Sequence, residues 1–536
     1  MRIALGQINT TVGDIRGNLM KALDVVGAAT ALDAGITLLP ELALTGYPPE
    51  DLLAKDHFVE DNLDALEQLA GACGSAVIVG FVNRVDDQLF NAAALLGNHR
   101  VLRIYHKRNL PNYGVFDERR YFTPGEGVDL MELGGNLMST TICEDIWVPG
   151  PAEEAAAEGA QLLFNVSASP FHTGKGAERE AMLAERARSN KMWLAYCNLV
   201  GGQDELVFDG RSCIISPEGT VIARGAAFEE DLVVADVTLG ARLGAPASDI
   251  KPMLEGPEEV YRALSLGLHD YVTKNGFSDV VLGLSGGVDS ALTATLAADA
   301  LGAEHVHGVM MPSRFSSEGS VADSELLADA LGIDARTIGI EGPHQAFLDS
   351  LAPSFEGREP DVAEENVQAR VRGTLLMGLS NKFNWLTLAT GNKSELSVGY
   401  STLYGDMVGG FAPIKDVFKT RVYELCEWRN RQGEVPVIPE AILTKAPSAE
   451  LRPDQVDQDS LPPYPVLDAI LTHYVEKDDS RDAIVAMGFP AAIVDKVLRL
   501  TDIAEYKRRQ GPLGVKITAK AFGRDRRMPV TNLYRG

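Results

Sequence analysis

The sequence predicts an α/β protein made of two domains. Three observations support this: the length, an alternation of strand-like and helix-like segments, and a glycine-rich turn between a strand and a helix near the middle. At 536 residues the chain exceeds one ordinary domain, and its 45% apolar content allows a sizeable core. We expect domains over residues 1–240 and 259–536. Residues 241–258, which hold Gly, Ala and Pro without periodicity, are expected to form a linker.

Composition excludes several classes of protein. The net charge of −26 argues against a nucleic-acid partner, which would require a basic surface. The five cysteines are widely spaced and form no C-x-x-C motif, which fits a reducing compartment. We find no signal peptide and no apolar run near the roughly 18 residues of a membrane helix. A cytoplasmic protein without a membrane partner is expected.

Strands and helices alternate through the first half. Apolar runs predict strands over residues 2–8, 37–40, 76–83, 101–106, 137–143, 162–167, 193–199, 212–216 and 232–237. Helical spacing predicts helices over 18–34, 57–73, 153–158 and 176–190. Such alternation predicts a layered α/β domain.

Glu41, Lys107 and Cys143 each stand where one of these strands ends. Strand ends line the crevices in which α/β proteins place their chemistry. A cysteine attacks a carbonyl as a thiolate, and a neighbouring ammonium lowers the pKa of a thiol. A carboxylate can take the thiol proton, and a lysine can stabilise an oxyanion. Taken alone, each residue has an ordinary explanation, since such a cysteine is usually a packing residue.

The strings around these residues are LPELALTGY at 39–47, HKRNLP at 106–111 and ICED at 142–145. They resemble the nitrilase superfamily, which implies a Glu–Lys–Cys amide-hydrolysing triad on a four-layer αββα sandwich. Residues 107–118 and 167–175 further resemble the glutaminase half of glutamine-dependent NAD synthetases. That resemblance implies that Tyr113, Ser169 and Lys175 bind glutamine, although Lys175 alone would be an ordinary loop lysine.

The glycine-rich turn is VVLGLSGGVDS at 280–290. Two glycines let the backbone approach a ligand, and the amides of the turn and of the following helix favour an anion. Asp289 beside a phosphate implies a cation between them, and Mg²⁺ prefers such oxygens. The string lacks the ending of a Walker A motif. It resembles the pyrophosphatase loop of ATP pyrophosphatases, which assigns ATP binding to Gly283, Leu284, Ser285, Gly286, Gly287, Val288, Asp289 and Ser290.

The second half alternates strands and helices more regularly and predicts a doubly wound parallel sheet, a Rossmann-like arrangement whose loops converge at one edge. Glu395 follows a predicted strand over 385–390 and is a candidate second metal ligand, or simply a glutamate favoured at a helix start. Residues 390–395 (TGNKSE) resemble the NAD synthetase segment in which Thr390 binds ATP and Glu395 binds metal and lies at the deamido-NAD site. The resemblance also assigns Lys445, in a Pro-rich loop over 433–465, to ATP. It assigns Asn366 and Lys516 to deamido-NAD.

The segment 396–404 contains no Lys or Arg, unlike many ammonia-using relatives, so the nicotinate-side contacts are not carried over in full. Together the resemblances imply a glutamine-hydrolysing NAD⁺ synthetase that uses L-glutamine, Mg²⁺, ATP and deamido-NAD⁺ and forms homo-oligomers. Two alternatives remain at this point. One is an amidotransferase with another acceptor, such as a GMP-type synthetase. The other is an amidase fused to a nucleotide-sensing module.

Overall fold

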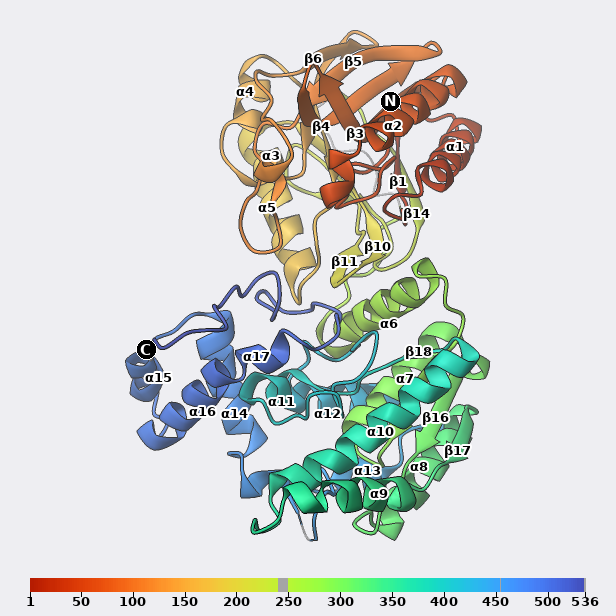
Figure 1. Cartoon of the computed structure of the whole chain (residues 1–536). Coiled ribbons are helices and arrows are strands. Elements are labelled where there is room, and N and C mark those ends of the chain that lie inside the picture. Colours follow the sequence, from red (N-terminus) through yellow and green to blue (C-terminus); the bar gives the residue numbers. More distant parts are fainter. Residues whose placement is uncertain (240–248, 454, 535–536) are drawn as a thin grey trace. The chain divides into compact units, whose positions relative to one another are not determined.

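The computed structural model describes residues 1–239, 249–453 and 455–534. The chain divides into two units, Met1–Glu255 and Gly256–Gly536, coloured red to yellow-green and green to blue in Figure 1. The expected linker falls partly on residues 240–248, which lie outside the described residues. Helix α6 begins at Gly256, inside the range expected for that linker.

Two six-stranded sheets form the centre of the first unit. The first has the order β14-β1-β2-β3-β4-β5 and the second β13-β12-β9-β8-β7-β6. The strands of the first sheet are β1 (Arg2–Gln7), β2 (Ile36–Leu38), β3 (Ala76–Val85), β4 (Gln88–Gly97), β5 (Arg100–His106) and β14 (Asp231–Asp236). Those of the second are β6 (Leu130–Leu133), β7 (Asn136–Ile142), β8 (Leu162–Ser167), β9 (Trp193–Asn198), β12 (Cys213–Ile215) and β13 (Val221–Arg224). A hairpin of β10 (Val200–Gln203) and β11 (Leu206–Asp209) completes the described strands of this unit.

The two sheets pack face to face with helices outside them. One buried cluster joins Ile3 and Leu38 of the first sheet to Phe164 and Trp193 of the second. A second cluster packs α1 (Ile15–Ala31) and α2 (Asp56–Ala72) on the first sheet. A third packs α4 (Pro151–Ala157) and α5 (Lys175–Asn190) on the second sheet. This is the αββα sandwich that the nitrilase resemblance implied.

Every strand predicted in this unit is present, but β4, β6, β10, β11 and β13 were not predicted. Strand β4 contains the run Asn91–Ala94, three of whose residues are alanine, and β10 contains two glycines, so neither carries a β-branched signal. Tertiary pairing overrides local preference at both. Strand β4, for instance, is hydrogen-bonded on both sides, to β3 and β5.

The second unit holds a parallel sheet of order β17-β16-β15-β18, as a doubly wound fold requires. Its strands are β15 (Val280–Leu284), β16 (Val306–Met310), β17 (Asp334–Thr337) and β18 (Leu386–Thr387). The chain order reverses between β15 and β18. Such a switch point opens a crevice at the carboxyl ends of the strands.

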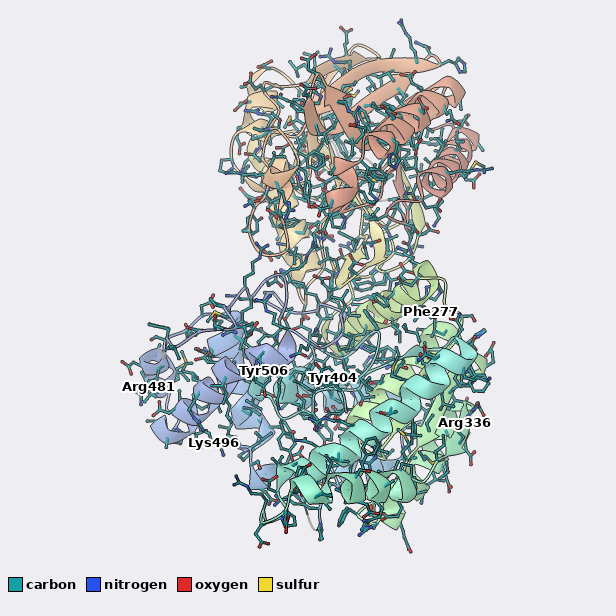
Figure 2. All side chains as sticks on the ribbon, in the orientation of Figure 1. Phe277, Arg336, Tyr404, Arg481, Lys496 and Tyr506 are labelled. Atoms are coloured by element: carbon teal, nitrogen blue, oxygen red, sulfur yellow. The ribbon has the colours of Figure 1, made fainter. Side chains whose placement is uncertain are left out.

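Helices cover this sheet and continue into a C-terminal helical segment. The helices packed on the sheet are α7 (Val288–Leu301), α8 (Glu318–Leu331) and α10 (Val362–Phe383). Those packed on these helices are α6 (Gly256–Lys274), α9 (Glu341–Leu351) and α12 (Lys419–Asn430). The remaining ones are α11 (Lys393–Val398), α13 (Glu440–Thr444), α14 (Tyr464–Leu471), α15 (Arg481–Ala486), α16 (Ala491–Ile503) and α17 (Glu505–Arg508). Helices α14 to α16 share a separate buried cluster with Val398 of α11. On the surface of this segment, Lys496 of α16 and Tyr506 of α17 are exposed (Figure 2). Within the described ranges, no helix has both the length and the apolarity to cross a membrane.

Candidate active sites

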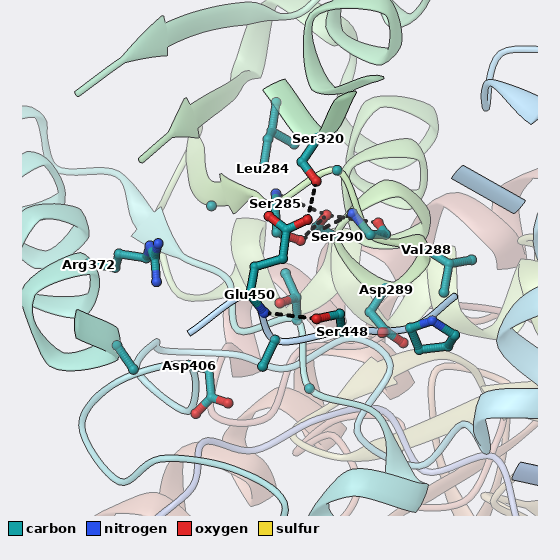
Figure 3. Close-up of a pocket in the computed structure, with 18 of the residues that line it drawn as sticks. Leu284, Ser285, Val288, Asp289, Ser290, Ser320, Arg372, Asp406, Ser448 and Glu450 are labelled. Carbon is teal, nitrogen blue, oxygen red and sulfur yellow. Dashed lines mark hydrogen bonds between the residues drawn. The ribbon is translucent and has the colours of Figure 1, made fainter. Parts of the chain in front are cut away.

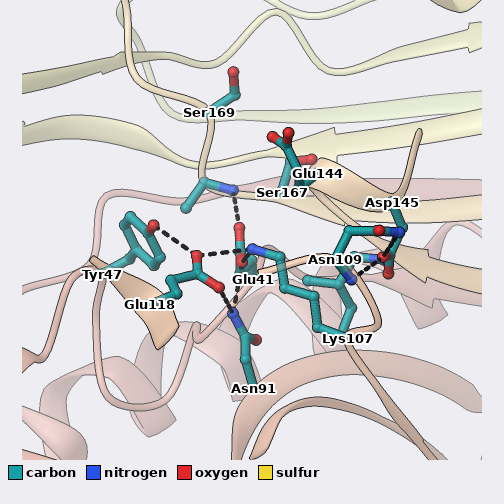
Figure 4. A network of polar contacts seen from close by, with 12 residues as sticks. Glu41, Tyr47, Asn91, Lys107, Asn109, Glu118, Glu144, Asp145, Ser167 and Ser169 are labelled. Atoms are coloured by element: carbon teal, nitrogen blue, oxygen red, sulfur yellow. Dashed lines mark hydrogen bonds and ion pairs between the residues drawn. The ribbon is translucent and has the colours of Figure 1, made fainter. Parts of the chain in front are cut away.

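Two of the strand-end residues of the first unit, Glu41 and Lys107, meet in one buried centre (Figure 4). The third, Cys143, is also buried and interacts electrostatically with both. The Lys107 ammonium donates to Glu41 Oε1 at 2.7 Å and to Glu118 Oε1 at 2.8 Å. Glu41 follows β2, and Gly80 of β3 makes room for it: a Cβ there would lie 2.6 Å from Glu41 Cα. A side chain at position 80 would therefore displace the glutamate.

Further donors hold the two carboxylates of this centre. Asn91 Nδ2 donates to Glu41 Oε1 at 2.7 Å, and the Ala168 amide donates to Glu41 Oε2 at 2.8 Å. The Tyr47 hydroxyl donates to Glu118 Oε1 at 2.9 Å. Burial and the nearby Glu41 raise the pKa of the Glu118 carboxyl to about 7, against the lowering effect of Lys107.

Cys143 stands on the tight turn between β7 and α3 (Glu144–Trp147), with φ 42° and ψ −99°. A non-glycine residue in that region is strained, and such strain concentrates at functional sites. Its amide donates to Val166 O at 2.9 Å. Burial first, and then Glu41, raise the pKa of the Cys143 thiol well above its usual value. Lys107 lowers it, as expected from the sequence, but with the smaller effect, so the thiol rests protonated and needs a base.

The three residues assigned to glutamine surround this centre. Tyr113 is exposed and its hydroxyl donates to Glu144, at 3.1 and 3.0 Å to the two oxygens. Ser169 follows Ala168, and its amide donates to Asn198 Oδ1 at 2.9 Å. The Lys175 ammonium lies 3.8 Å from the centre of the Trp147 ring, and burial lowers the pKa of Lys175. Tyr113 and Lys175 both interact electrostatically with Cys143, so they lie near the nucleophile.

A second site lies at the switch point of the parallel sheet, in a cavity of about 280 Å³ (Figure 3). All the glycine-rich loop residues from Gly283 to Ser290 line it, together with Thr390, Glu395 and Lys445. The loop closely contacts α8, because a Cβ on Gly286, whose φ is +73°, would lie 2.5 Å from Ser320 O. Ser290 Oγ accepts from the Ser285 amide at 3.3 Å and lies 3.1 Å from Ser285 Oγ.

The two predicted metal ligands converge on one cation. The Lys419 ammonium donates to Asp289 Oδ2 and, at 3.0 Å, to Glu395 Oε1. Asn392 links the same two residues: its Nδ2 donates to Asp289 Oδ1 at 2.9 Å, and its Oδ1 accepts from the Glu395 amide at 3.0 Å. Burial raises the pKa of the Glu395 carboxyl to about 8. Two carboxylates that share one ammonium are close enough to share a metal ion.

The donor set fits Mg²⁺ rather than a transition metal. No group of three or more His, Cys, Asp or Glu side chains with metal-binding geometry occurs among the described residues. Mg²⁺ needs only one or two carboxylates when phosphate oxygens and water supply the other ligands. Asp289 and Glu395 therefore suit a metal that arrives with a nucleotide.

Lys445 is already paired within the cavity. Its ammonium contacts Ser320 Oγ and lies 3.0 Å from Glu450 Oε1. The same Glu450 oxygen accepts from Ser320 Oγ at 2.6 Å (Figure 3). It also accepts from Ser317 Oγ at 3.1 Å. A carboxylate thus sits beside the loop at the start of α8.

The residues assigned to deamido-NAD are not all at the cavity wall. Glu395 lines the cavity, and so does Thr402. Asn366 lies behind Thr402, whose hydroxyl donates to Asn366 Oδ1 at 2.8 Å. Lys516 is buried and is not among the residues that line the cavity. Its Nζ donates to Thr518 O at 2.6 Å and lies 3.4 Å from Asp525 Oδ2. On α10, Arg372 lines the cavity, whereas its neighbour Arg370 is exposed.

Sequence reasoning missed Lys419, Glu450 and Asn91. Lys419 lies 130 positions from Asp289, so no local spacing joins them. Glu450 lies in the segment KAPSAEL, five positions after Lys445. That short spacing was the signal that could have identified it as a partner of Lys445. Asn91 lies on a strand that was not predicted.

Both halves of the chain match known protein families. The carbon-nitrogen hydrolase family matches residues 2–242 and the NAD synthase family matches residues 260–511. The glutamine-dependent NAD(+) synthetases of Thermotoga maritima and Aquifex aeolicus are 45% and 46% identical to this chain. Each match spans 100% of this chain, with 99% and 100% of the relatives.

A solved structure is similar over the same extent. The glutamine-dependent NAD+ synthetase from Acinetobacter baumannii, in complex with adenosine diphosphate, is 43% identical with a TM-score of 0.82. The match covers 99% of this chain and 98% of that one. Full-length similarity of this kind favours an NAD synthetase over the GMP-type and nucleotide-sensing alternatives. The chain therefore belongs to the glutamine-dependent NAD(+) synthetases, which are ATP-dependent carbon–nitrogen ligases.

Proposed function

We propose that the first centre releases ammonia from L-glutamine and that the second uses it to amidate deamido-NAD⁺. The observation that carries the proposal is the convergence of Glu41, Lys107 and Cys143 in one unit and of Asp289, Glu395 and the glycine-rich loop in the other. Either centre alone would support a simpler enzyme. The presence of both centres in one chain combines a site that releases ammonia with a site that uses it.

In the first centre, Glu41 takes the proton of Cys143 and the sulfur attacks the side-chain amide carbon of glutamine. Lys107 stabilises the oxyanion, and the amide nitrogen leaves as ammonia once it has gained a proton from Glu41. Water activated by Glu41 then cleaves the thioester, which frees glutamate and the thiol. Tyr113, Ser169 and Lys175 bind the substrate, and the ammonium of Lys175 suits a carboxylate.

In the second centre, a carboxylate oxygen of deamido-NAD⁺ attacks the α-phosphorus of ATP and displaces pyrophosphate. Ammonia then attacks the acyl-adenylate and expels AMP, which gives NAD⁺. The bound adenosine diphosphate of the Acinetobacter structure supports a nucleotide in this cavity. Residues 283–290 hold the phosphates, with Thr390 and Lys445 beside them. Asn366, Glu395 and Lys516 serve the deamido-NAD side.

Asp289 and Glu395 would hold Mg²⁺, which when bound neutralises charge on the phosphates. Lys419 would leave the two carboxylates and turn its ammonium to a phosphate. The fit of the donor set supports this exchange. The remaining parts of the proposal are functional domains over 1–240 and 259–536, a cytoplasmic homo-oligomer, and no nucleic-acid partner. The free, buried cysteines and the net charge of −26 support the location and the last point.

The decisive experiment measures NAD⁺ formation from deamido-NAD⁺ and Mg·ATP by native and Cys143→Ala protein, with glutamine and then with ammonium chloride. We expect Cys143→Ala to lose activity with glutamine and keep it with ammonium, because only the first centre needs the thiol. If the native protein forms NAD⁺ from neither nitrogen source, the proposed acceptor is wrong.

A further inference from the structure

Asn91 of β4 joins the two carboxylates of the first centre. Its side chain is fully buried, and its amide nitrogen donates to Glu41 Oε1 at 2.7 Å and, at a longer 3.5 Å, to Glu118 Oε2 (Figure 4). Its main-chain oxygen accepts from the Lys107 amide at 2.8 Å. One residue therefore contacts both glutamates and fixes the backbone of the lysine between them.

The orientation of the Asn91 amide follows from its neighbours. Among the described residues, the Asn91 Oδ1 atom has no hydrogen-bond partner. The reverse orientation would turn this acceptor toward two carboxylates, which offer no hydrogen when ionised. In the observed orientation the amide nitrogen of Asn91 donates to Glu41, and its oxygen is left without a hydrogen-bond donor among the described residues. A side chain kept only for packing would not need this arrangement.

A count of hydrogen bonds shows which oxygen of Glu41 has a free acceptor position. Each carboxylate oxygen has about two lone-pair positions. Oε1 already accepts from Lys107 Nζ and Asn91 Nδ2, so both of its positions are used. Among the described residues, Oε2 accepts one hydrogen bond, from the Ala168 amide at 2.8 Å, which leaves one position.

We propose that Asn91 is a positioning residue of the glutaminase centre, whose amide occupies Glu41 Oε1 so that Oε2 receives the thiol proton. This inference rests on the proposed function of that centre. In the step, the proton moves from Cys143 Sγ to Glu41 Oε2 and the S–H electron pair stays on sulfur. Sulfur then forms a bond to the amide carbon, and the carbonyl π electrons move to the oxygen that Lys107 stabilises.

Asn91 does this without adding charge to a crowded centre. The charged and titratable groups around Glu41 are Lys107, Glu118, Cys143, Tyr47 and Glu144. A second cation would compete with Lys107 for the carboxylates, and a further acid would repel them. A neutral donor stabilises ionised Glu41 and leaves the proton count of the centre unchanged.

The test is the pH dependence of glutamine hydrolysis by full-length Asn91→Ala and Asn91→Asp. For Asn91→Ala we expect kcat to fall about 100-fold with the KM for glutamine little changed, as for loss of a partner that orients a catalytic group. The acid limb of its pH–rate profile should move to higher pH by about one unit, because the Glu41 carboxylate loses one hydrogen-bond donor. Asn91→Asp keeps the shape of the side chain but adds a carboxylate beside Glu41 and Glu118. We expect its kcat for glutamine hydrolysis to fall further than that of Asn91→Ala above neutral pH.

Asn83→Ala is the matched control. Asn83 is a buried asparagine on the adjacent β3. Its Nδ2 lies 2.9 Å from His106 Nε2, and within the described part of the chain it makes no hydrogen bond to Glu41 or Glu118. Its kcat and acid limb should match those of the native protein. Native hydrolysis of glutamine in the same assay tests the proposed function separately, so its absence would not be mistaken for a failure of this inference.

Two results would overturn the proposal. One is an Asn91→Ala protein with native kcat and a native acid limb. The other is a loss of hydrolysis accompanied by rapid alkylation of Cys73, Cys197 and Cys213, which are buried in the native fold. That second result would assign Asn91 a role in folding alone.

Discussion

Both units contain a buried lysine held between two carboxylates, but the surroundings of the two lysines differ. The side chains of Glu41 and Glu118, around Lys107, are 0% and 6% exposed. Those of Asp289 and Glu395, around Lys419, are 17% and 18% exposed and line a cavity. The same charge pattern is therefore enclosed in the first centre and open to a cavity in the second.

The neighbours of each pair explain the difference. In the first centre, Asn91 and the Ala168 amide donate to Glu41 and Tyr47 donates to Glu118, so several donors besides Lys107 hold the two carboxylates. At the second centre, Asn392 donates to the Asp289 carboxylate and accepts from the main-chain amide of Glu395, and the glycine-rich loop lines the same cavity. A cation that accompanies a phosphate can therefore replace the Lys419 ammonium.

The largest expected effect comes from removing each lysine in turn. Lys107→Met should lower glutamine hydrolysis about 1,000-fold, because oxyanion stabilisation is lost. It should also cost about 3–5 kcal/mol of stability, since two buried carboxylates lose their cation. Ammonium-driven NAD⁺ formation should remain. Glutamine hydrolysis, NAD⁺ formation and thermal unfolding measure these effects.

Lys419→Met should show the reverse division of activities. Glutamine hydrolysis should stay native, while NAD⁺ formation should fall with either nitrogen source. Its loss of stability should be much smaller, because its carboxylates reach solvent through the cavity. If Lys419→Met destabilises the protein as much as Lys107→Met does, the contrast between a fixed and an exchangeable lysine is wrong.

The next effect concerns the metal. Asp289→Asn should raise the Mg²⁺ concentration for half-maximal NAD⁺ formation about tenfold or more, because one of two carboxylate ligands is lost. A Mg²⁺ titration at saturating ATP measures this. Asp299→Asn, on the same helix but paired with Arg429, is the control and should titrate as the native protein does. An equal shift in both variants would argue against Asp289 as a ligand.

Mg²⁺ binding should also release a proton from Glu395. Burial raises the pKa of the Glu395 carboxyl to about 8, so below that pH the carboxyl holds a proton that the metal must displace. Apparent Mg²⁺ affinity should therefore rise with pH up to about 8 and then level off. Calorimetry in buffers of different ionisation enthalpy counts the proton. Glu395→Gln should abolish the dependence; an unchanged slope would contradict it.

A smaller effect is expected at Glu118. Its pKa, raised to about 7 by burial, means that glutamine hydrolysis should increase as pH rises through 7, because ionised Glu118 holds Lys107 in place. In Glu118→Gln this inflection should be missing from the pH–rate profile of the ammonia-releasing step. Persistence of the inflection would assign it to another group.

The smallest expected effect is at Tyr113. Tyr113→Phe removes an exposed hydroxyl that bonds Glu144, so the KM for glutamine should rise about fivefold, as for the loss of one modest hydrogen bond. The kcat should stay native. A fall in kcat without a change in KM would instead place the hydroxyl in the chemical step.

Features set by local sequence were predicted well. The strands preceding Glu41, Lys107 and Cys143 are apolar runs, and the loop from Gly283 to Ser290 is a specific string. The sequence therefore placed these residues at strand ends and on a turn, where the structure has them. Lys419 and Asn91 were not predicted, because contacts across 130 and 50 positions leave no periodic trace. Cys143 shows a third case: the effect of Lys107 on its pKa was foreseen, but the larger effect of burial depends on packing.

The pairing of Lys419 with Asp289 and Glu395, and of Lys445 with Glu450, has a thermodynamic consequence. Each ligand entering alone must break contacts that already exist. Free Mg²⁺ must displace the Lys419 ammonium from its carboxylates, and free ATP must compete with Glu450 for Lys445. Metal and nucleotide entering together exchange all these contacts at once. We therefore expect each to raise the affinity for the other by the same factor, so that the cavity selects the Mg·ATP complex over its parts.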